Sequence, residues 1–404
     1  RPSSRARSYL SLAEVDKGLI VQFQLDGGSE FATKRCKPAI MRAFQAAKDL
    51  SGSTEGNHAD FVTRSEFRLL LVYTQRYFEL LAVFDEVEAN PTTRHVEAGR
   101  AFAAAGIPDL IVAVGGGSAM DCAKGINFIY SCGGQMKDYW GIGKASKPML
   151  PLIAIPTTAG TGSECQSFAL ISDAATHAKM ACGDPKAMAK VAILDSELTL
   201  SQPQRVTACT GIDAVAHAVE SAVTRKRNET SQQYSRVAFS LLSKSLPVVL
   251  KDSTNLEARG RMLLGAAFAG TAIEHSMLGA AHSAANPLTA HYNVIHGQAV
   301  GIMLPHVVRF NGADETIEKE YASLVAGTVA DSNSGSPVHH SLAGVMEDFM
   351  DLANIPRYLV ECGVDASKID ILSEEAASQW TASFNPRDIA AADFKALYQK
   401  AFAS

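Results

Sequence analysis

Hydrophobic and polar residues follow a regular pattern from about residue 91 to residue 199. PDLIVAVGGGS (108–118) and PLIAIPTTAG (151–160) are apolar runs that end in small residues, which is typical of buried parallel strands. TTRHVEAGRAFAAAG (92–106) and AMDCAKGINFIY (119–130) have helical spacing, and KVAILDSELTL (190–200) indicates a last strand. Strands that alternate with helices predict a doubly wound, mostly parallel sheet.

The pattern changes after Ser201-Gln202-Pro203. The strand signal ends there, and long helical patterns fill the rest of the chain. We therefore expect an α/β domain over residues 1–198 and an all-helical domain over residues 199–404.

The first 90 residues are less regular. LIVQFQL (19–25) and FRLLLVY (67–73) are strand-like, and PAIMRAFQAAKDL (38–50) has helical spacing. Only about ten residues separate Val72 from Val83, which is too short for a helical crossover between parallel strands. This segment is therefore atypical of the α/β fold that follows it.

Composition excludes several classes of protein. The formal net charge is −5 and the pI is about 6.1, so the chain has no basic surplus for nucleic acid. No apolar run reaches the ~18 residues of a membrane-spanning helix. The seven cysteines form no CxxC pair, which favours free thiols in a reducing compartment, and we expect a cytoplasmic protein.

Two glycine-rich or hydroxyl-rich loops follow the predicted strands. Gly115–Ser118 lies where a strand passes into a helix, so backbone N–H groups can face a bound anion, although Met120 stands where a G-x-G-x-x-G turn has its third glycine. Thr157–Ser163 is a second loop of small residues. Each loop could also be only a tight or polar turn.

Asp213 and His217 lie four residues apart in a predicted helix, on one face. Such a pair is common on helix surfaces, but apolar neighbours indicate that this one is buried. His282 and His296 also lie among small and apolar residues. Three histidines and one aspartate would form a mixed nitrogen and oxygen site for Fe(II) or Zn(II).

Four motifs in this order resemble the iron-containing (group III) alcohol dehydrogenases. They are GGGSAMDCAK (115–124), IPTTAGTGSE (155–164), TGIDAVAHAVES (210–221), and the His282 and His296 segment running into GIMLPHVVRFN (301–311). The resemblance extends from about Val83 to the C-terminus and fades after about residue 320. It implies a metal-dependent oxidoreductase that transfers a hydride between NAD(P) and a small alcohol or aldehyde, acting as a homodimer or higher homo-oligomer.

The resemblance also implies roles for individual residues. The α/β domain would bind NAD or NADP, and the helical domain would bind Fe(II) or, as an alternative, Zn(II). The metal ligands implied are Asp213, His217, His282 and His296. The cofactor-binding residues implied are Gly115, Gly116, Gly117, Ser118, Asp121, Thr157, Thr158, Thr161, Ser163 and Lys179. The family's ribose-binding Asp aligns with Thr74, so the choice between NAD and NADP stays open.

One position departs from the family pattern. The family commonly has a second His four residues after the third ligand, whereas this chain has Asn286, which can position a hydroxyl but cannot titrate. Phe168 and Ile273 are candidates for the substrate pocket, with plain core packing as the alternative.

Two other functions remain open. A lyase or synthase of the dehydroquinate-synthase-like type has the same architecture, although the set of four metal ligands favours the alcohol dehydrogenases. The unusual N-terminal segment and Asn286 also allow a nucleotide- or metal-binding relative without activity.

Overall fold

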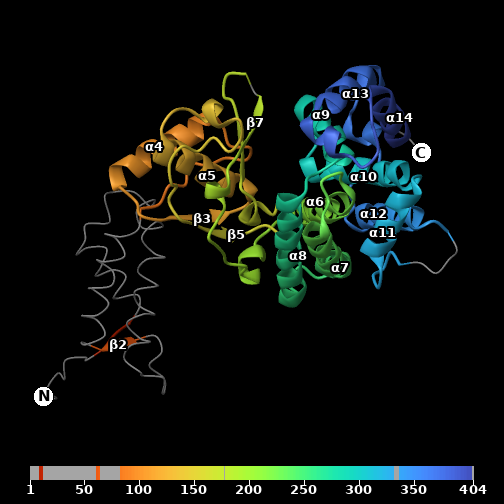
Figure 1. Cartoon of the computed structure of the whole chain (residues 1–404). Helices are drawn as coiled ribbons and strands as arrows, with labels where there is room; N and C mark the ends of the chain where they lie inside the picture. The colour runs from red at the N-terminus through yellow and green to blue at the C-terminus, as the bar shows by residue number, and fades with distance from the viewer. Residues whose placement is uncertain (1–8, 12–60, 64–81, 177, 332–335, 403–404) are drawn as a thin grey trace, which may run out of the picture. The chain divides into compact units, whose positions relative to one another are not determined.

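The computed structural model describes residues 9–11, 61–63, 82–176, 178–331 and 336–402 (Figure 1). The chain divides into two compact units, Arg1–Asp85 and Glu86–Ser404. In the first unit, β1 (Tyr9–Ser11) pairs antiparallel with β2 (Phe61–Thr63). The elements predicted at 19–25, 38–50 and 67–73, and Thr74, lie outside the described residues.

The second unit begins with a parallel sheet. Its strands are β3 (Ile111–Gly115), β5 (Leu152–Pro156) and β8 (Val191–Ala192), in the order β3-β5-β8. Helices α4 (Thr93–Gly106) and α5 (Gly117–Cys132) flank β3 in sequence, as the helical spacing predicted. The strand predicted over 190–200 is shorter than expected, because only two residues pair with β5.

Side chains alternate between the two faces of this sheet. Ala113 and Ala154 point to one face, where they pack against Met120 of α5. Val112 and Val114 point to the other face and are about half exposed in the structure.

A second, mixed sheet was not expected from the sequence. It consists of β4 (Gly141–Ile142), β7 (Lys179–Gly183) and β6 (Phe168–Ser172), with β4 parallel and β6 antiparallel to β7. The helix α5 also contacts β6, so this sheet belongs to the same α/β half of the unit.

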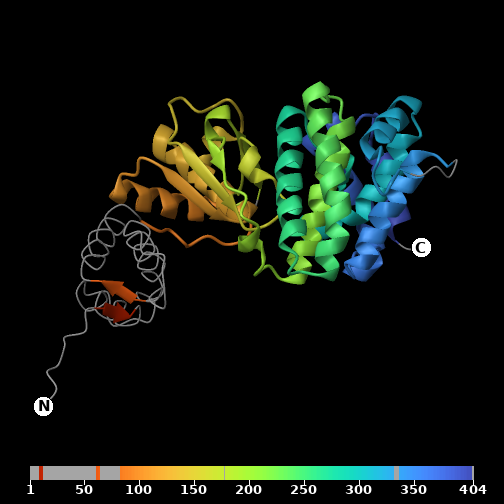
Figure 2. The same cartoon turned by 90° about the horizontal axis from the view of Figure 1, so that it is seen from below.

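The rest of the second unit is helical, as predicted. Figure 2 shows α7 and α8 running side by side, and both contact α6. The helices are α6 (Gln204–Val223), α7 (Glu229–Lys251), α8 (Leu256–His275), α9 (Ala280–Tyr292), α10 (His296–Gly312), α11 (Glu315–Val325), α12 (Val338–Leu352), α13 (Ile369–Ser378) and α14 (Ala391–Phe402).

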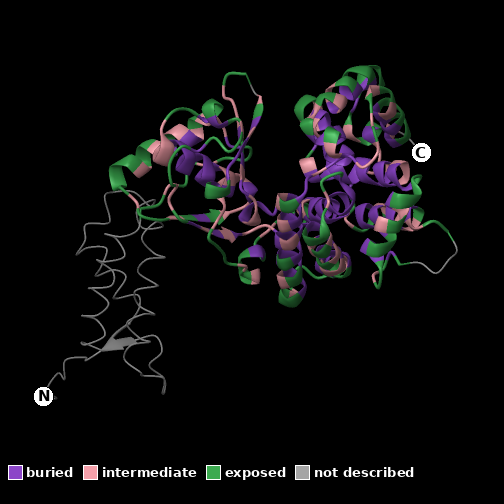
Figure 3. Ribbon diagram, in the orientation of Figure 1, coloured by how far each residue is buried: buried purple, intermediate pink, exposed green. Residues whose placement is uncertain are grey.

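The core of the helical half surrounds α6. Every residue of α6 from Gly211 to Val223 is buried, and buried residues also fill most of α10 (Figure 3). A helix that is buried all round can hold polar side chains only where they have partners or a function. No helix in the described part of the chain is long and apolar enough to cross a membrane.

Candidate metal and cofactor site

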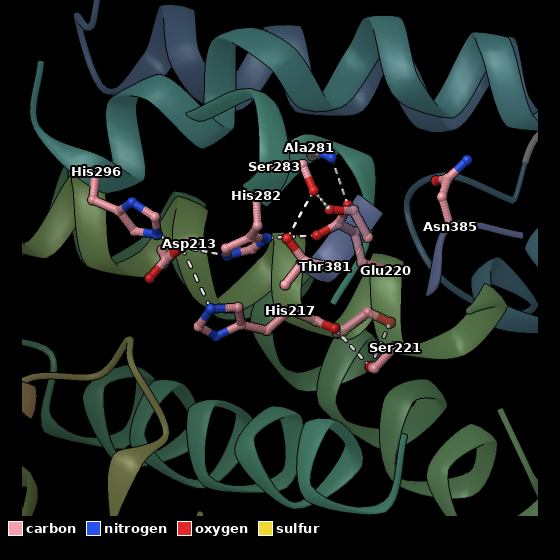
Figure 4. A network of polar contacts seen from close by, with 12 residues as sticks. Asp213, His217, Glu220, Ser221, Ala281, His282, Ser283, His296, Thr381 and Asn385 are labelled. Carbon is pink, nitrogen blue, oxygen red and sulfur yellow. Dashed lines mark hydrogen bonds and ion pairs between the residues drawn. The ribbon is translucent and has the colours of Figure 1, made fainter. Parts of the chain in front are cut away.

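Three helices bring the predicted metal ligands together. Asp213 and His217 lie one turn apart on α6, His282 lies in the first turn of α9, and His296 is the first residue of α10 (Figure 4). Asp213 Oδ1 lies 3.5 Å from His217 Nε2, 3.3 Å from His282 Nε2 and 3.9 Å from His296 Nε2. The four side chains therefore converge on one small space.

Two polar atoms in this space have no hydrogen-bond partner in the described part of the chain. Asp213 Oδ1 and His282 Nε2, 3.3 Å apart, are both buried without a hydrogen bond, and His217 Nε2 lies 3.5 Å from the same Asp213 oxygen. A buried polar atom left without a partner costs about 1–3 kcal/mol. Ligand atoms of the three residues lie within 4.8 Å of one another, so a divalent cation fits this donor set.

His296 gives the group its open side. The side chains of His217 and His282 are 6% and 4% exposed, whereas that of His296 is 36% exposed. A site that is closed on one side and open on the other is typical of a catalytic metal, which needs a position for substrate.

The charges in the group favour a cation. Burial opposes ionisation of Asp213, but the surrounding imidazoles, first His217, lower its pKa below the ordinary value. Burial lowers the pKa of His217, and the pKa of His296 falls to about 3, first through desolvation and then through the nearby His282. Asp213 is therefore ionised while His217 and His296 are neutral, which is the form in which these side chains bind metal.

Glu220, which the sequence analysis did not select, contacts one of these residues. It is 4% exposed on α6, and its Oε2 accepts a hydrogen bond from His282 Nδ1 at 2.5 Å. Although burial opposes protonation of His282, the Glu220 and Asp213 carboxylates raise its pKa to about 9. The sequence held one signal, because residue 220 follows Asp213 by seven positions and so lies on the same helix face.

The two small-residue loops also lie side by side. The backbone N–H of Thr157 donates to Gly115 O at 2.9 Å, and Gly115 has a φ of +148°, which favours glycine. A Cβ at Gly117 would lie 2.6 Å from Thr161 Cγ2. The first turn of α5 therefore presents its N–H groups next to the threonine loop (Thr157–Ser163). One bound nucleotide could contact both.

Buried charges hold the threonine loop against α5. Lys124 Nζ donates to Ser163 O at 2.6 Å and to Ser163 Oγ at 2.8 Å, and Ser163 Oγ donates to Asp121 Oδ1 at 2.6 Å. Lys124 is fully buried, and burial lowers its pKa while raising that of Asp121. Asp121 and Ser163 thus have partners inside the protein, and their contact with cofactor stays a prediction.

The threonine loop also contacts the helical half. A Cβ at Gly270 of α8 would lie 2.4 Å from Gly162 O, so the two backbones are in close contact. Ser167, just after the loop, donates from its N–H and Oγ to Glu274 of α8 at 2.9 and 2.7 Å. A Cβ at Gly160 would meet Thr210, one turn before Asp213, at 2.5 Å. These contacts place the loop beside the helix that carries Asp213.

The remaining predicted residues lie around this region. Lys179, at the start of β7, is close enough to contribute to the pKa shifts of both Asp121 and His296. Asn286 Nδ2 donates to Gln379 Oε1 at 3.0 Å.

The two candidates for the substrate pocket differ in their surroundings. The Phe168 ring packs against that of Trp380, with centroids 6.0 Å apart. Ile273 is 6% exposed, inside α8. Both assignments to the pocket stay predictions.

Two family models together match most of the second unit, and the first of them begins before that unit. Residues 50–196 match iron-containing alcohol dehydrogenase, and residues 207–402 match the C-terminal part of the Fe-containing alcohol dehydrogenase family. Residues 2–74 match a different model, the FCaBP EF-hand domain. Residues 2–49 therefore resemble a different family from the rest, and residues 50–74 fall within both matches.

Curated relatives share about a third of their residues with the chain. Alcohol dehydrogenase 4 of Schizosaccharomyces pombe is 32% identical over 79% of the chain and 75% of that protein. NAD-dependent methanol dehydrogenase of Bacillus methanolicus is 31% identical over 80% and 84%. The 1,3-propanediol dehydrogenase of Klebsiella pneumoniae is 31% identical over 80% and 83%.

Solved structures have the same fold. Alcohol dehydrogenase from Oenococcus oeni has a TM-score of 0.77 at 28% identity, over 90% of the chain and 96% of that protein. A crystal structure of 1,3-propanediol oxidoreductase has a TM-score of 0.75 at 29% identity, over 83% and 88%.

Proposed function

The chain belongs to the iron-containing alcohol dehydrogenase family and is a metal-dependent alcohol oxidoreductase, and we propose which residues carry its chemistry. Asp213, His217, His282 and His296 hold the divalent metal, and the two small-residue loops bind the nicotinamide cofactor. The relatives are dehydrogenases and reductases, which does not favour the lyase or synthase alternative.

One observation carries the proposed metal site. Buried ligand atoms from α6 and α9 face one another without hydrogen bonds, and His296 of α10 completes the group on its open side. A protein stabilises such an arrangement poorly unless a cation fills it. Carboxylate and imidazole ligands suit Fe(II), which we propose first, and also Zn(II).

The residues of the chain divide the work of the reaction. Held by Asp213, His217, His282 and His296, a divalent metal would supply Lewis acidity toward the substrate oxygen, and the nicotinamide cofactor would supply or accept the hydride. The first turn of α5 offers N–H groups to the pyrophosphate, and the hydroxyls of Thr157, Thr158 and Thr161 orient the nicotinamide half. Asn286 positions a hydroxyl or water through its amide and does not take up the proton.

We further propose a cytoplasmic enzyme that forms a homodimer or higher homo-oligomer. All six cysteines in the described part of the chain are free, which supports a reducing compartment. The oligomeric state stays a prediction, and a measurement of the molecular mass in solution tests it.

Nicotinamide absorbance tests the activity. Purified protein is loaded with Fe(II) or Zn(II) and assayed with NADH and with NADPH. The substrates are short aldehydes, including 3-hydroxypropanal, which corresponds to 1,3-propanediol. We expect turnover with at least one aldehyde, and the assay also identifies the cofactor. Stoichiometric metal without any turnover would instead support a relative that has lost activity.

A matched pair of variants tests the metal site. His282→Ala should lose both bound metal and turnover, whereas His291→Ala, an exposed histidine of the same helix that pairs with Glu375, should keep both. Normal metal content and turnover in His282→Ala would overturn the ligand assignment.

A further inference from the structure

Glu220 is a buried carboxylate in contact with the proposed site but outside the set of ligands (Figure 4). We infer that it is a positioning residue, which fixes the tautomer and the orientation of His282 for metal binding. The inference rests on the proposed function, because it concerns the metal that Asp213, His217, His282 and His296 would hold.

Hydrogen bonds determine which nitrogen of His282 carries the proton. The Glu220 carboxylate can only accept, so the 2.5 Å contact places the proton on His282 Nδ1. His282 Nε2 is then the nitrogen that gives up its proton when a metal binds, and it is the buried atom without a hydrogen bond, 3.3 Å from Asp213 Oδ1. A histidine ligand oriented by a carboxylate on its other nitrogen is a common arrangement in metal sites.

The same carboxylate fixes the start of α9. Gly279 is the N-cap residue and has no side chain to bond the free N–H groups of the first turn. Glu220 Oε1 takes this role, because it accepts the backbone N–H of Ala281 at 2.7 Å. One side chain of α6 therefore holds both the helix that carries His282 and the imidazole itself.

The Glu220 carboxylate and Asn385 both pack closely against Gly279. A Cβ at Gly279 would lie 3.1 Å from Glu220 Oε1 and 3.3 Å from Asn385 Oδ1. Asn385 is fixed in turn by two hydrogen bonds exchanged with Asn311, at 2.9 and 3.0 Å. Glycine at 279 thus allows Glu220 to reach both of its donors.

Glu220→Gln tests the inference with a nearly isosteric change. The glutamine oxygen can still accept from Ala281, but its NH₂ group meets His282 Nδ1 as a donor and moves the imidazole proton to Nε2. Zn²⁺ affinity is measured on metal-free protein by competition with a chromogenic chelator. We expect the affinity to fall about 10–100-fold relative to wild type. The Co²⁺-loaded protein should also show an altered visible spectrum.

Tyr398→Phe is the structural control. It removes the bond from Tyr398 Oη to Ala284 O on α9, 2.7 Å long and buried, without touching His282. Its Zn²⁺ affinity and Co²⁺ spectrum should match wild type. Equal losses in Tyr398→Phe and Glu220→Gln would overturn the positioning role, as would wild-type affinity in Glu220→Gln.

A second variant guards against misfolding of Glu220→Gln. Gly279→Ala keeps the carboxylate but crowds its Oε1, so it should also weaken Zn²⁺ binding while circular dichroism stays native. Unchanged affinity in this variant would count against the inference. If the wild-type protein itself bound no Zn²⁺ or Fe(II), the proposed function would fail first, and the two failures are thereby distinguished.

Discussion

Glu164 is a carboxylate that the fold buries without a full set of partners. It is 3% exposed, and its Oε1 has no hydrogen bond in the structure. Burial raises its pKa from 4.5 to about 7, although the nearby ammonium of Lys124 acts in the opposite direction. Near neutral pH the folded protein therefore retains a proton that the unfolded chain has released.

This difference makes stability depend on pH. Between about pH 4.5 and 7 the unfolded state binds fewer protons than the folded state, so the free energy of unfolding falls as pH rises. The full effect is about 3 kcal/mol at most. Glu164→Gln should therefore be more stable than wild type at pH 8, by about 1–3 kcal/mol, and similar to it at pH 4.5.

Urea unfolding at the two pH values measures this effect. Glu257→Gln is the control, because Glu257 is exposed on α8 and pairs with Arg261 of the same helix. The same stability difference at both pH values would contradict the assignment of the effect to Glu164.

Single residues differ in how far the sequence predicts them. Asp213, His217, His282 and His296 stand in recognisable motifs, and the structure brings them together. Glu220 and Lys124 also lie in recognisable motifs, but they act through partners 62 and 39 residues away, so their roles become visible only when the fold gives those distances. A charged residue in a predicted helix is by default a surface residue, so spacing alone did not select them.

At the scale of secondary structure, the helices α5 and α8 hold the threonine loop in place. It is bonded to α5 through Lys124 and packed on α8 at Gly270. The small residues at these contacts allow a backbone-to-backbone approach that larger side chains would block.

Gly270→Ala should therefore disturb the loop. Its Cβ would lie 2.4 Å from Gly162 O, so either the loop or α8 must move. We expect a loss of stability of about 1–3 kcal/mol and weaker NAD(P) binding. Fluorescence titration with NADH and NADPH, alongside urea unfolding, measures both effects.

Gly260→Ala on the same helix is the matched control. Among the residues that the structure describes, its Cβ would meet Ser196 Cβ alone, at 3.8 Å, which is an ordinary contact. Alanine has the higher helix propensity, so this variant should be stabilised by about 0.5–1 kcal/mol with cofactor affinity unchanged. Wild-type cofactor affinity in Gly270→Ala would show that the contact with α8 does not matter for the loop.

Helices were easier to predict than strands at this scale. The helical spacing of 92–106 and 119–130 corresponds to α4 and α5, because each run is long enough for its apolar positions to repeat over several turns. The hairpin of β6 and β7 was not predicted, although its strands are as long as β3 and β5. Its position depends on contacts with α5 that are distant in the sequence.

Across the whole molecule, the sequence predicts the order of the two halves but not all of their boundaries. A parallel sheet followed by helices was expected, and the structure has both. The boundary near residue 199 stays a prediction. The match of residues 2–74 to an EF-hand family was not foreseen, because the strand-like runs at 19–25 and 67–73 and the helical spacing at 38–50 do not by themselves indicate an EF-hand.

The proposed metal would stabilise the fold of the helical half as a whole, because its ligands come from three helices, α6, α9 and α10. The first and last ligands, Asp213 and His296, are 83 residues apart in the sequence. A ligand that binds only the folded state stabilises it by RT ln(1 + [L]/Kd), which is about 4 kcal/mol at a ligand concentration a thousand times Kd.

Adding Zn²⁺ to metal-free protein should thus raise the Tm. The Asp213→Asn variant should lose this rise, because it lacks the charged ligand common to all three contacts. NADH should still raise the Tm of the variant, since the turn at Gly115 and the first turn of α5 are unchanged. A Zn²⁺-dependent rise of equal size in wild type and in Asp213→Asn would place the bound metal elsewhere in the chain.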